Sequence, residues 1–213
     1  MGPSTESDYW DKFYSSWEEP VPSQFAVLVA GSFTKSGVTI FDFGCGNGRD
    51  SLFFHKYGFT VASSDRSSVA IANLEKKFNE SNNAPRFNVV DYGIDTQFMS
   101  YLVENKAEDS NSLFYARFLL HAFDAKSLEV FLGAVSKAAQ PGDILAFEFR
   151  TRTDDRLSGK ATPDHFRRGV EIHEVMRYFN DDRFKVLLTV EGFGFAIYKS
   201  DNAHVARLVL EVL

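Results

Sequence analysis

Three glycines alternate with other residues in the segment FDFGCGNGRD, which covers residues 41–50. They are Gly44, Gly46 and Gly48, and they stand between the apolar runs VTI and SLFF, where a strand is expected to give way to a helix. Glycine has no Cβ atom, so this backbone can turn sharply and let a ligand approach closely. N–H groups at the start of the following helix would favour negative charge. The spacing predicts a ligand-binding turn, with a tight turn that binds nothing as the alternative.

Carboxylates end each of the first three expected strands. Asp42 stands two residues before the first glycine, Asp65 ends the second strand, and Asp91 with Tyr92 ends the third. A carboxylate at the end of the second strand can accept both hydroxyl groups of a ribose. Glycines and carboxylates together therefore predict a nucleoside site. The dinucleotide fingerprint requires Gly or Ala at position 49, where Arg49 stands. Arg49 therefore counts against a nicotinamide-dependent oxidoreductase, which is kept as an alternative.

The elements that must position these residues alternate along the chain. Helices are expected over residues 7–17 and 23–34, separated by the prolines of EEPVP. Further helices are expected over 49–57, 67–79, 95–106, from Asp124 to the stop at Gln140-Pro141-Gly142, and near 171–180. Strands are expected over 38–43, 59–64, 86–90, 112–118, 143–150, 184–190 and 205–212. This pattern predicts an α/β fold, a doubly wound and mostly parallel seven-stranded sheet with helices on both faces. Ligands of such sheets bind beyond the carboxyl ends of the strands.

Composition limits the classes of partner. The 213 residues fit one domain, and a formal net charge of −6 counts against binding to a nucleic-acid backbone. The single cysteine, Cys45, cannot form an internal disulfide. We find no segment typical of a signal peptide or a membrane span and no ligand spacing of a zinc or calcium site. We therefore expect a cytoplasmic protein that needs no metal, no membrane and no nucleic acid.

The motif DFGCGNG, with Asp65 and Asp91 at the next two strand ends, resembles the cofactor motifs of the class I S-adenosylmethionine-dependent methyltransferases. The resemblance runs from about Val38 to the end and implies a Rossmann-like fold, a final antiparallel strand pair and S-adenosyl-L-methionine as cofactor. It also implies that Asp65 and its neighbour Arg66 lie at the ribose, and that Asp91 meets the adenine amino group with Tyr92 beside the ring. The backbone from Gly44 through Cys45, Gly46 and Asn47 to Gly48 is implied to surround the methionine and ribose portions. Asp42 would support this loop or reach the methionine amine, and Arg117, a further candidate cofactor-binding residue, should face the mouth of the site.

The N-terminal segment DYWDKFYSSW resembles an aromatic lid found in many small-molecule members of this family. This similarity implies that Tyr9, Tyr14 and Trp17 help to close the site, and simple packing of an amphipathic helix is the alternative. With the family in view, the single domain divides into four parts. They are a helical lid over 1–36, a cofactor-binding core over 37–150, a substrate insert and helix over 151–182, and C-terminal strands over 183–213.

A candidate base follows the fourth strand. Methyl transfer gains mostly from alignment of donor and acceptor, whereas a hydroxyl acceptor also benefits from a group that takes its proton. His121, in YARFLLHAF, stands at the carboxyl end of that strand, and His165 lies in the insert after the fifth strand. The alternative for His121 is that it caps the next helix or packs under the cofactor. The other three histidines, His55, His173 and His204, are interpreted as structural or surface residues.

The insert after the fifth strand is rich in cations although the chain is acidic. Arg150, Arg167 and Arg168, with His165, are the candidate acceptor-binding residues, because a guanidinium group binds phosphate or carboxylate through two hydrogen bonds. The segments YARFLLHAF, EFR and DHFRR are also similar to a subgroup found with polysaccharide or secondary-metabolite assembly genes. The sequence thus predicts methyl transfer to O or N of a small, anionic metabolite or saccharide. A non-catalytic S-adenosylmethionine-binding protein is a further alternative, and a homodimer is left open.

Overall fold

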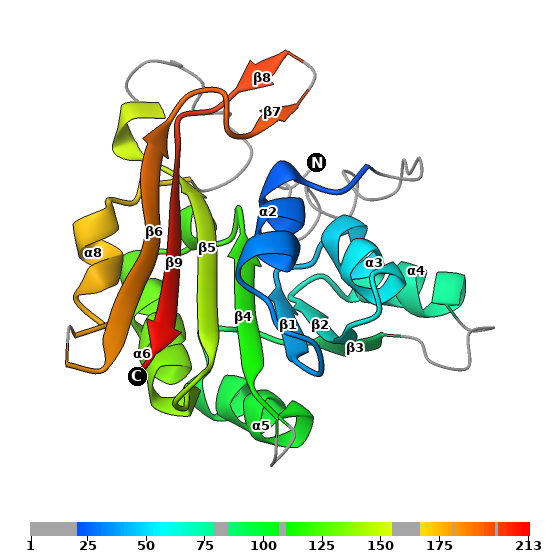
Figure 1. Cartoon of the computed structure of the whole chain (residues 1–213). Coiled ribbons are helices and arrows are strands. Elements are labelled where there is room, and N and C mark those ends of the chain that lie inside the picture. The colour runs from blue at the N-terminus through cyan, green and yellow to red at the C-terminus, as the bar shows by residue number, and fades with distance from the viewer. Residues whose placement is uncertain (1–20, 79–84, 107–109, 155–166, 181, 199) are drawn as a thin grey trace.

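The computed structural model describes residues 21–78, 85–106, 110–154, 167–180, 182–198 and 200–213. Its centre is a seven-stranded sheet with the strand order β3-β2-β1-β4-β5-β9-β6 (Figure 1). The strands are β1 (Thr39–Phe43), β2 (Thr60–Asp65), β3 (Arg86–Val89), β4 (Ser112–Arg117), β5 (Ile144–Arg150), β6 (Phe184–Gly192) and β9 (Val205–Val212). Strands β1 to β5 are parallel, and β9 runs antiparallel to both of its neighbours, β5 and β6. The expected mostly parallel, seven-stranded α/β sheet is confirmed.

Helices cover both faces of this sheet (Figure 1). They are α2 (Gln24–Ser32), α3 (Arg49–Lys56), α4 (Ser68–Phe78), α5 (Asp95–Asn105), α6 (Ala125–Ala138) and α8 (Ile172–Met176). Strand β1 shows how the layers are separated, because successive side chains of a strand point to opposite faces. Ile40 packs in a cluster with residues of α2 and α3, whereas Phe41 and Phe43 pack in a larger cluster with residues of α5, α6 and α8. The abundant phenylalanines therefore fill the core on both faces.

The register places the carboxyl ends of the central strands together. Phe43, the last residue of β1, pairs with Ser64 of β2 on one side and with Ala116 of β4 on the other. The glycine segment begins directly after Phe43, so it leaves the sheet at the point where the chain order reverses between β1 and β4. The antiparallel strand β9, inserted between β5 and β6, distinguishes this sheet from the strand order 3-2-1-4-5-6 of dinucleotide-binding domains.

Two small elements were not predicted. One is a 3₁₀ turn, η1 (Leu120–Ala122), which follows β4. The other is the hairpin of β7 (Ile197–Tyr198) and β8 (Asp201–Asn202), which lies between β6 and β9 in the chain. It extends beyond the carboxyl ends of the parallel strands (Figure 1). Its base is a buried cluster of Ala196, Ala203 and Val205, against which Phe118 packs. Within the described ranges, no helix has the length and apolarity needed to cross a membrane.

Candidate active site

The glycine segment adopts a backbone that only glycine takes easily. Gly44, Gly46 and Gly48 have φ angles of 66°, 54° and 71°, in the left-handed region. A Cβ atom on Gly44 would lie 2.9 Å from the side chain of Leu119, and one on Gly48 would lie 2.5 Å from Leu74. The alternation of glycines therefore meets both a conformational and a packing requirement of this turn.

Most backbone N–H groups of the turn are used inside the protein. Gly44 N–H donates to the Tyr92 hydroxyl at 2.8 Å, and Gly46 N–H donates to Asp65 Oδ2 at the same distance. Cys45 N–H donates to the carbonyl of Ser64 at 2.9 Å. These three N–H groups, which precede the start of α3 at Arg49, are therefore not available to a ligand. Their hydrogen bonds instead fix the turn against the end of β2.

Asp65 lies where the sequence places it, at the carboxyl end of β2. Its Oδ1 accepts the N–H of Ser67 at 2.8 Å, while its Oδ2 accepts the N–H of Gly46. Burial raises the pKa of this carboxyl group, and the backbone N–H groups of Ser67 and Gly46 oppose that rise. Arg66, the next residue, is exposed. Asp65 thus joins the glycine turn to the end of the second strand, and its remaining lone pairs can accept further donors.

Tyr92 requires a correction. The family resemblance implied that its ring lies beside an adenine, but Tyr92 is only 2% exposed and its ring packs edge-on against Phe43, Phe98 and Phe131. Its hydroxyl group donates to the carbonyl of Ser64 at 2.8 Å and accepts the N–H of Gly44. Tyr92 therefore supports the glycine turn from within the core.

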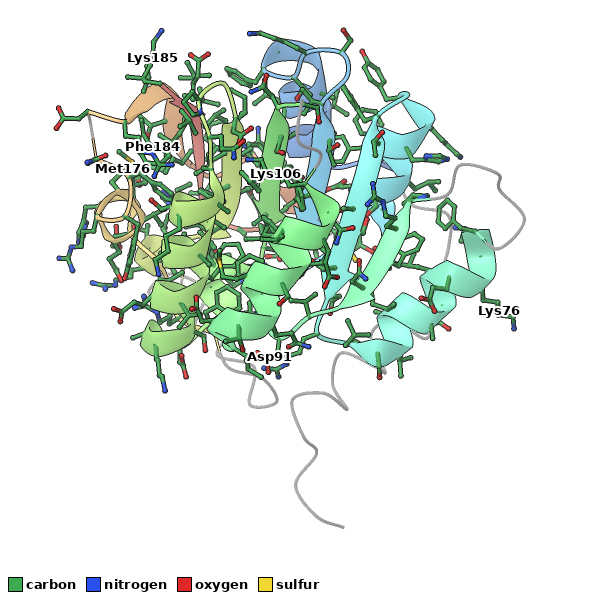
Figure 2. The ribbon with its side chains drawn as sticks, turned by 90° about the horizontal axis from the view of Figure 1, so that it is seen from below. Lys76, Asp91, Lys106, Met176, Phe184 and Lys185 are labelled. Carbon is green, nitrogen blue, oxygen red and sulfur yellow. The ribbon has the colours of Figure 1, made fainter. Side chains whose placement is uncertain are left out.

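Asp91 follows β3 and lies at the start of α5, at the opposite end of that helix from Lys106 (Figure 2). Its Oδ1 accepts the N–H of Gly93 at 2.9 Å, and its own N–H donates to Gln97 Oε1 at 2.9 Å. The side chain is partly exposed. Asp91 thus presents a carboxylate at the same edge of the sheet as Asp65.

The two remaining residues of the turn differ in burial. Cys45 is 8% exposed and packs with Ile71 and Leu74 of α4, and burial raises the pKa of its thiol group. The side chain of Cys45 is therefore a core side chain. Asn47 is partly exposed at the tip of the turn.

Sequence reasoning identified Asp42 but missed the acid beside it. Asp42 is 3% exposed and accepts the Ser51 hydroxyl at 2.5 Å. Burial and the nearby Asp50 raise the pKa of Asp42 to about 8. The buried Asp50 accepts the Ser23 N–H at 2.8 Å and the Tyr115 hydroxyl at 2.8 Å. The available signal was the position of Asp50 in the first turn of the helix that follows the glycines.

Buried charges continue across the sheet from Asp50. Arg117, at the end of β4, donates from Nε to Glu148 Oε1 of β5 at 2.9 Å. Arg207 of β9 donates from Nε to Glu148 Oε2 at 2.7 Å. Glu148 and Arg207 were also missed, although a charge inside an apolar strand such as ILAFEFR was the signal for the first. The expectation that Arg117 lies at the site is compatible with its place at the carboxyl edge.

The contacts of His121 agree with a residue that packs inside the protein and not with a catalytic base. Its ring is 4% exposed, lies edge-on to Phe118 and accepts the N–H of Arg150 at Nδ1 over 3.2 Å. Its carbonyl group accepts the N–H of Arg168 at 3.0 Å. His121 therefore connects η1, the end of β5 and the segment after residue 166, and its burial does not support the role of a base.

The arginines proposed to hold the acceptor are paired with carboxylates. Arg150 donates to Asp154 at 2.8 Å and also to Asp201. Arg168 donates to Glu174 at 2.9 Å. These ion pairs correct the expectation that Arg150 and Arg168 present their charge to an anion. Arg167 lies next to Arg168 and is partly exposed.

Several expected residues lie outside the described ranges, namely Tyr9, Tyr14, Trp17 and His165. In the part of the chain that the structure describes, no group of three or more His, Cys, Asp and Glu side chains could hold a metal ion.

Comparison with known proteins adds a family model and related structures. The model described as "Tellurite resistance protein TehB" matches residues 5–103, slightly less than half of the chain. A SAM-dependent methyltransferase from Anabaena variabilis is 17% identical, with 97% of this chain and 93% of that chain covered and a TM-score of 0.71. TehB from Haemophilus influenzae is 19% identical, with 97% and 66% covered and a TM-score of 0.68.

The N-methyltransferase NodS from Bradyrhizobium japonicum, crystallised with S-adenosyl-L-homocysteine, is 12% identical, with 98% and 99% covered and a TM-score of 0.65. No curated protein matches the chain. These comparisons and the order of the seven strands agree with the resemblance drawn from DFGCGNG, Asp65 and Asp91. The chain therefore has the fold of the class I S-adenosylmethionine-dependent methyltransferases.

Proposed function

We propose that the protein is a methyltransferase that uses S-adenosyl-L-methionine and methylates O or N of a small, anionic metabolite or saccharide. The observation that carries this proposal is the hydrogen bond from Gly46 N–H to the Asp65 carboxylate, which holds the glycine turn against the end of β2 at the switch point of the sheet. The family match to residues 5–103 includes both residues.

The residues present fit this cofactor. The left-handed glycines leave one side of the turn without side chains, so the methionine and ribose portions can lie against the backbone. Asp65 would accept the ribose hydroxyl groups, and Asp91 would accept the adenine amino group. A bound cation would stabilise the charged form of the buried Asp42 carboxyl group. When bound, S-adenosyl-L-methionine supplies an activated methyl group, and the chain supplies alignment and exclusion of water.

The acceptor is assigned less directly, because the family match ends at residue 103, before β4. NodS is named an N-methyltransferase, and a magnesium protoporphyrin IX methyltransferase from Synechocystis shares the fold with a TM-score of 0.57 and 14% identity. The names of these two relatives therefore point to no common acceptor. An anionic acceptor is supported by Arg117 at the carboxyl end of β4, whereas Arg150 and Arg168 are paired with carboxylates.

Calorimetry tests the cofactor assignment. S-adenosyl-L-homocysteine and S-adenosyl-L-methionine should each bind at one site, whereas NAD should not bind. Binding of NAD with no binding of S-adenosyl-L-homocysteine would contradict the proposal and favour the oxidoreductase alternative. The antiparallel strand β9 already counts against that alternative.

Methyl transfer should then be measured with radiolabelled S-adenosyl-L-methionine and a panel of small amines, phenols and sugars, each with and without a phosphate or carboxylate group. Tellurite belongs in the panel because of the name of the matching family model. Transfer to acceptors that carry the anionic group is the expected result. Tight cofactor binding with no transfer to any member of the panel would favour the non-catalytic alternative.

A further inference from the structure

We propose that Arg117, held by Glu148, binds the anionic group of the acceptor. This inference rests on the proposed function and replaces Arg150 and Arg168 in the acceptor-binding role that the sequence gave to them. The ligand that it predicts carries a phosphate or a carboxylate group, since both match the two terminal nitrogens of a guanidinium group.

The register of the sheet places Arg117 next to the glycine turn. Ala116 pairs with Phe43, so Arg117 and Gly44 each follow directly at the carboxyl edge of neighbouring strands. Arg117 shares the α2 and α3 face of the sheet with Tyr115, whose hydroxyl group donates to Asp50 in the first turn of α3. An acceptor bound here would lie beside the site proposed for the cofactor.

Contacts on two sides hold the Arg117 guanidinium group in one orientation. Nε donates to Glu148 at 2.9 Å, and the group lies over the ring of Phe118 with its carbon 4.3 Å from the ring centre. Arg207 occupies the other oxygen of Glu148 and also donates to the carbonyl of Phe195. Among the described residues, none accepts a hydrogen bond from the two terminal nitrogens of Arg117, and the Arg117 side chain is 15% exposed. These nitrogens are therefore placed to donate to a ligand.

The charges around Arg117 leave an excess of one cation. Three guanidinium groups, those of Arg49, Arg117 and Arg207, face two carboxylates, those of Asp50 and Glu148. Burial and the neighbouring Asp50 raise the pKa of Asp42, which favours the uncharged form of that carboxyl group. The cluster is largely buried, so solvent screens this charge only weakly. An anion would compensate it.

The other arginines of this edge are balanced differently. Arg150 donates to two carboxylates, those of Asp154 and Asp201, while Arg152 and Arg168 share Glu174. An anion that bound to Arg150 would have to displace a carboxylate already in place. This comparison distinguishes Arg117 from Arg150 and Arg168, which the sequence analysis had proposed for their place after the fifth strand.

The backbone beside Arg117 is held in a rare conformation. Phe118 has a φ angle of 57°, the only positive φ of a non-glycine residue in the described ranges. Its N–H donates to the carbonyl of Glu148 at 2.8 Å, and its ring contacts the guanidinium groups of both Arg117 and Arg150. Such conformations are concentrated at ligand sites, where the surrounding structure maintains them. The left-handed conformation of Phe118 therefore indicates that the fold holds the backbone at the end of β4, next to Arg117, in one conformation despite its strain.

The test uses the full chain saturated with S-adenosyl-L-homocysteine and titrated with inorganic phosphate and phenyl phosphate at constant ionic strength. Arg117→Gln should weaken binding of both probes by about tenfold or more, as expected for a lost hydrogen bond to a charged group. Glu148 keeps Arg207 as a partner in this variant, so the fold should persist. Arg117→Lys keeps the charge without the planar fork and should give an intermediate affinity.

Arg168→Gln is the matched control. It also removes a guanidinium group from this edge of the sheet, but that group is already paired with Glu174. It should bind both probes like the wild type. Equal affinity of the wild type and Arg117→Gln, loss of affinity only in Arg168→Gln, or no saturable binding by the wild type would each overturn the inference. Failure of the wild type to bind S-adenosyl-L-homocysteine would instead contradict the proposed function, so the two failures are distinguishable.

Discussion

At the scale of single residues, the carboxylates at the carboxyl edge differ in what surrounds them. Asp65 accepts two backbone N–H groups, from Gly46 and Ser67, and remains at the edge of the turn. Asp42 accepts the hydroxyl group of Ser51 and is almost completely buried. The same residue type therefore serves two purposes, and each purpose has its own test.

Asp65→Ala should weaken the binding of S-adenosyl-L-homocysteine by about 1.5 to 3 kcal/mol, because hydrogen bonds to a charged group are lost. Calorimetry measures this change, and thermal unfolding of the same samples reports any loss of the turn itself. Asp124→Ala, which removes an exposed carboxylate at the start of α6, is the control and should bind normally. Unchanged affinity in Asp65→Ala would remove this residue from the cofactor site.

Asp42→Asn should change how stability depends on pH. The folded state keeps the Asp42 proton up to a pKa of about 8, whereas the unfolded state releases it near its ordinary value. Wild-type stability should therefore fall as pH rises from about 4 to about 8, by about 1.4 kcal/mol per pH unit from this group alone. Urea unfolding of both proteins at pH 5 and pH 8 should show that the variant gains stability relative to the wild type at the higher pH. A constant difference between the two proteins would show that Asp42 is ionised throughout.

At the scale of elements, local signals were sufficient for most helices and strands. Asp124 was expected to open a helix, and its carboxylate caps α6 by accepting the N–H of Ser127 at 2.7 Å. Segments such as VTIFDF and SLFYARF were expected to be buried strands, and they are β1 and β4. The hairpin of β7 and β8 was missed, because two-residue strands show no periodicity and depend on packing at Phe118 and Ala203.

Ser23 connects one such helix to the candidate site. Its hydroxyl group accepts the N–H of Ala26 as the N-cap of α2 and donates to Asp50 at 2.7 Å. Ser23→Ala should therefore cost the cap, about 1 kcal/mol, and also one donor to a buried carboxylate, about 1 to 3 kcal/mol. Chemical denaturation measures the sum. Asp124→Ala removes a cap on the exposed surface and should cost less, and equal losses in the two variants would contradict a role for Ser23 beyond capping.

At the scale of the whole molecule, Glu148 joins three strands that are distant in sequence. Its carboxylate binds Arg117 of β4 and Arg207 of β9 from its own place in β5, and it is fully buried. Glu148→Ala should destabilise the protein by about 3 to 5 kcal/mol, because two buried guanidinium groups lose their counter-charge. Urea unfolding measures the loss, and Glu148→Gln, which keeps one acceptor, should lose less. A change near zero for Glu148→Ala would show that solvent replaces the carboxylate.

The amino-acid sequence by itself determined the alternation of strands and helices, the glycine turn and the acids Asp42, Asp65 and Asp91 at the strand ends. These features follow from local propensity, from periodicity and from the rule that parallel strands end at one edge. Only the tertiary structure decided which charged side chains are already neutralised. Arg150 pairs with Asp201 across 51 positions of sequence and Arg117 with Glu148 across 31, whereas Tyr92 turned inward to support Gly44. The charge presented to a ligand is a sum over neighbours in space, and those neighbours are known only once the chain is folded.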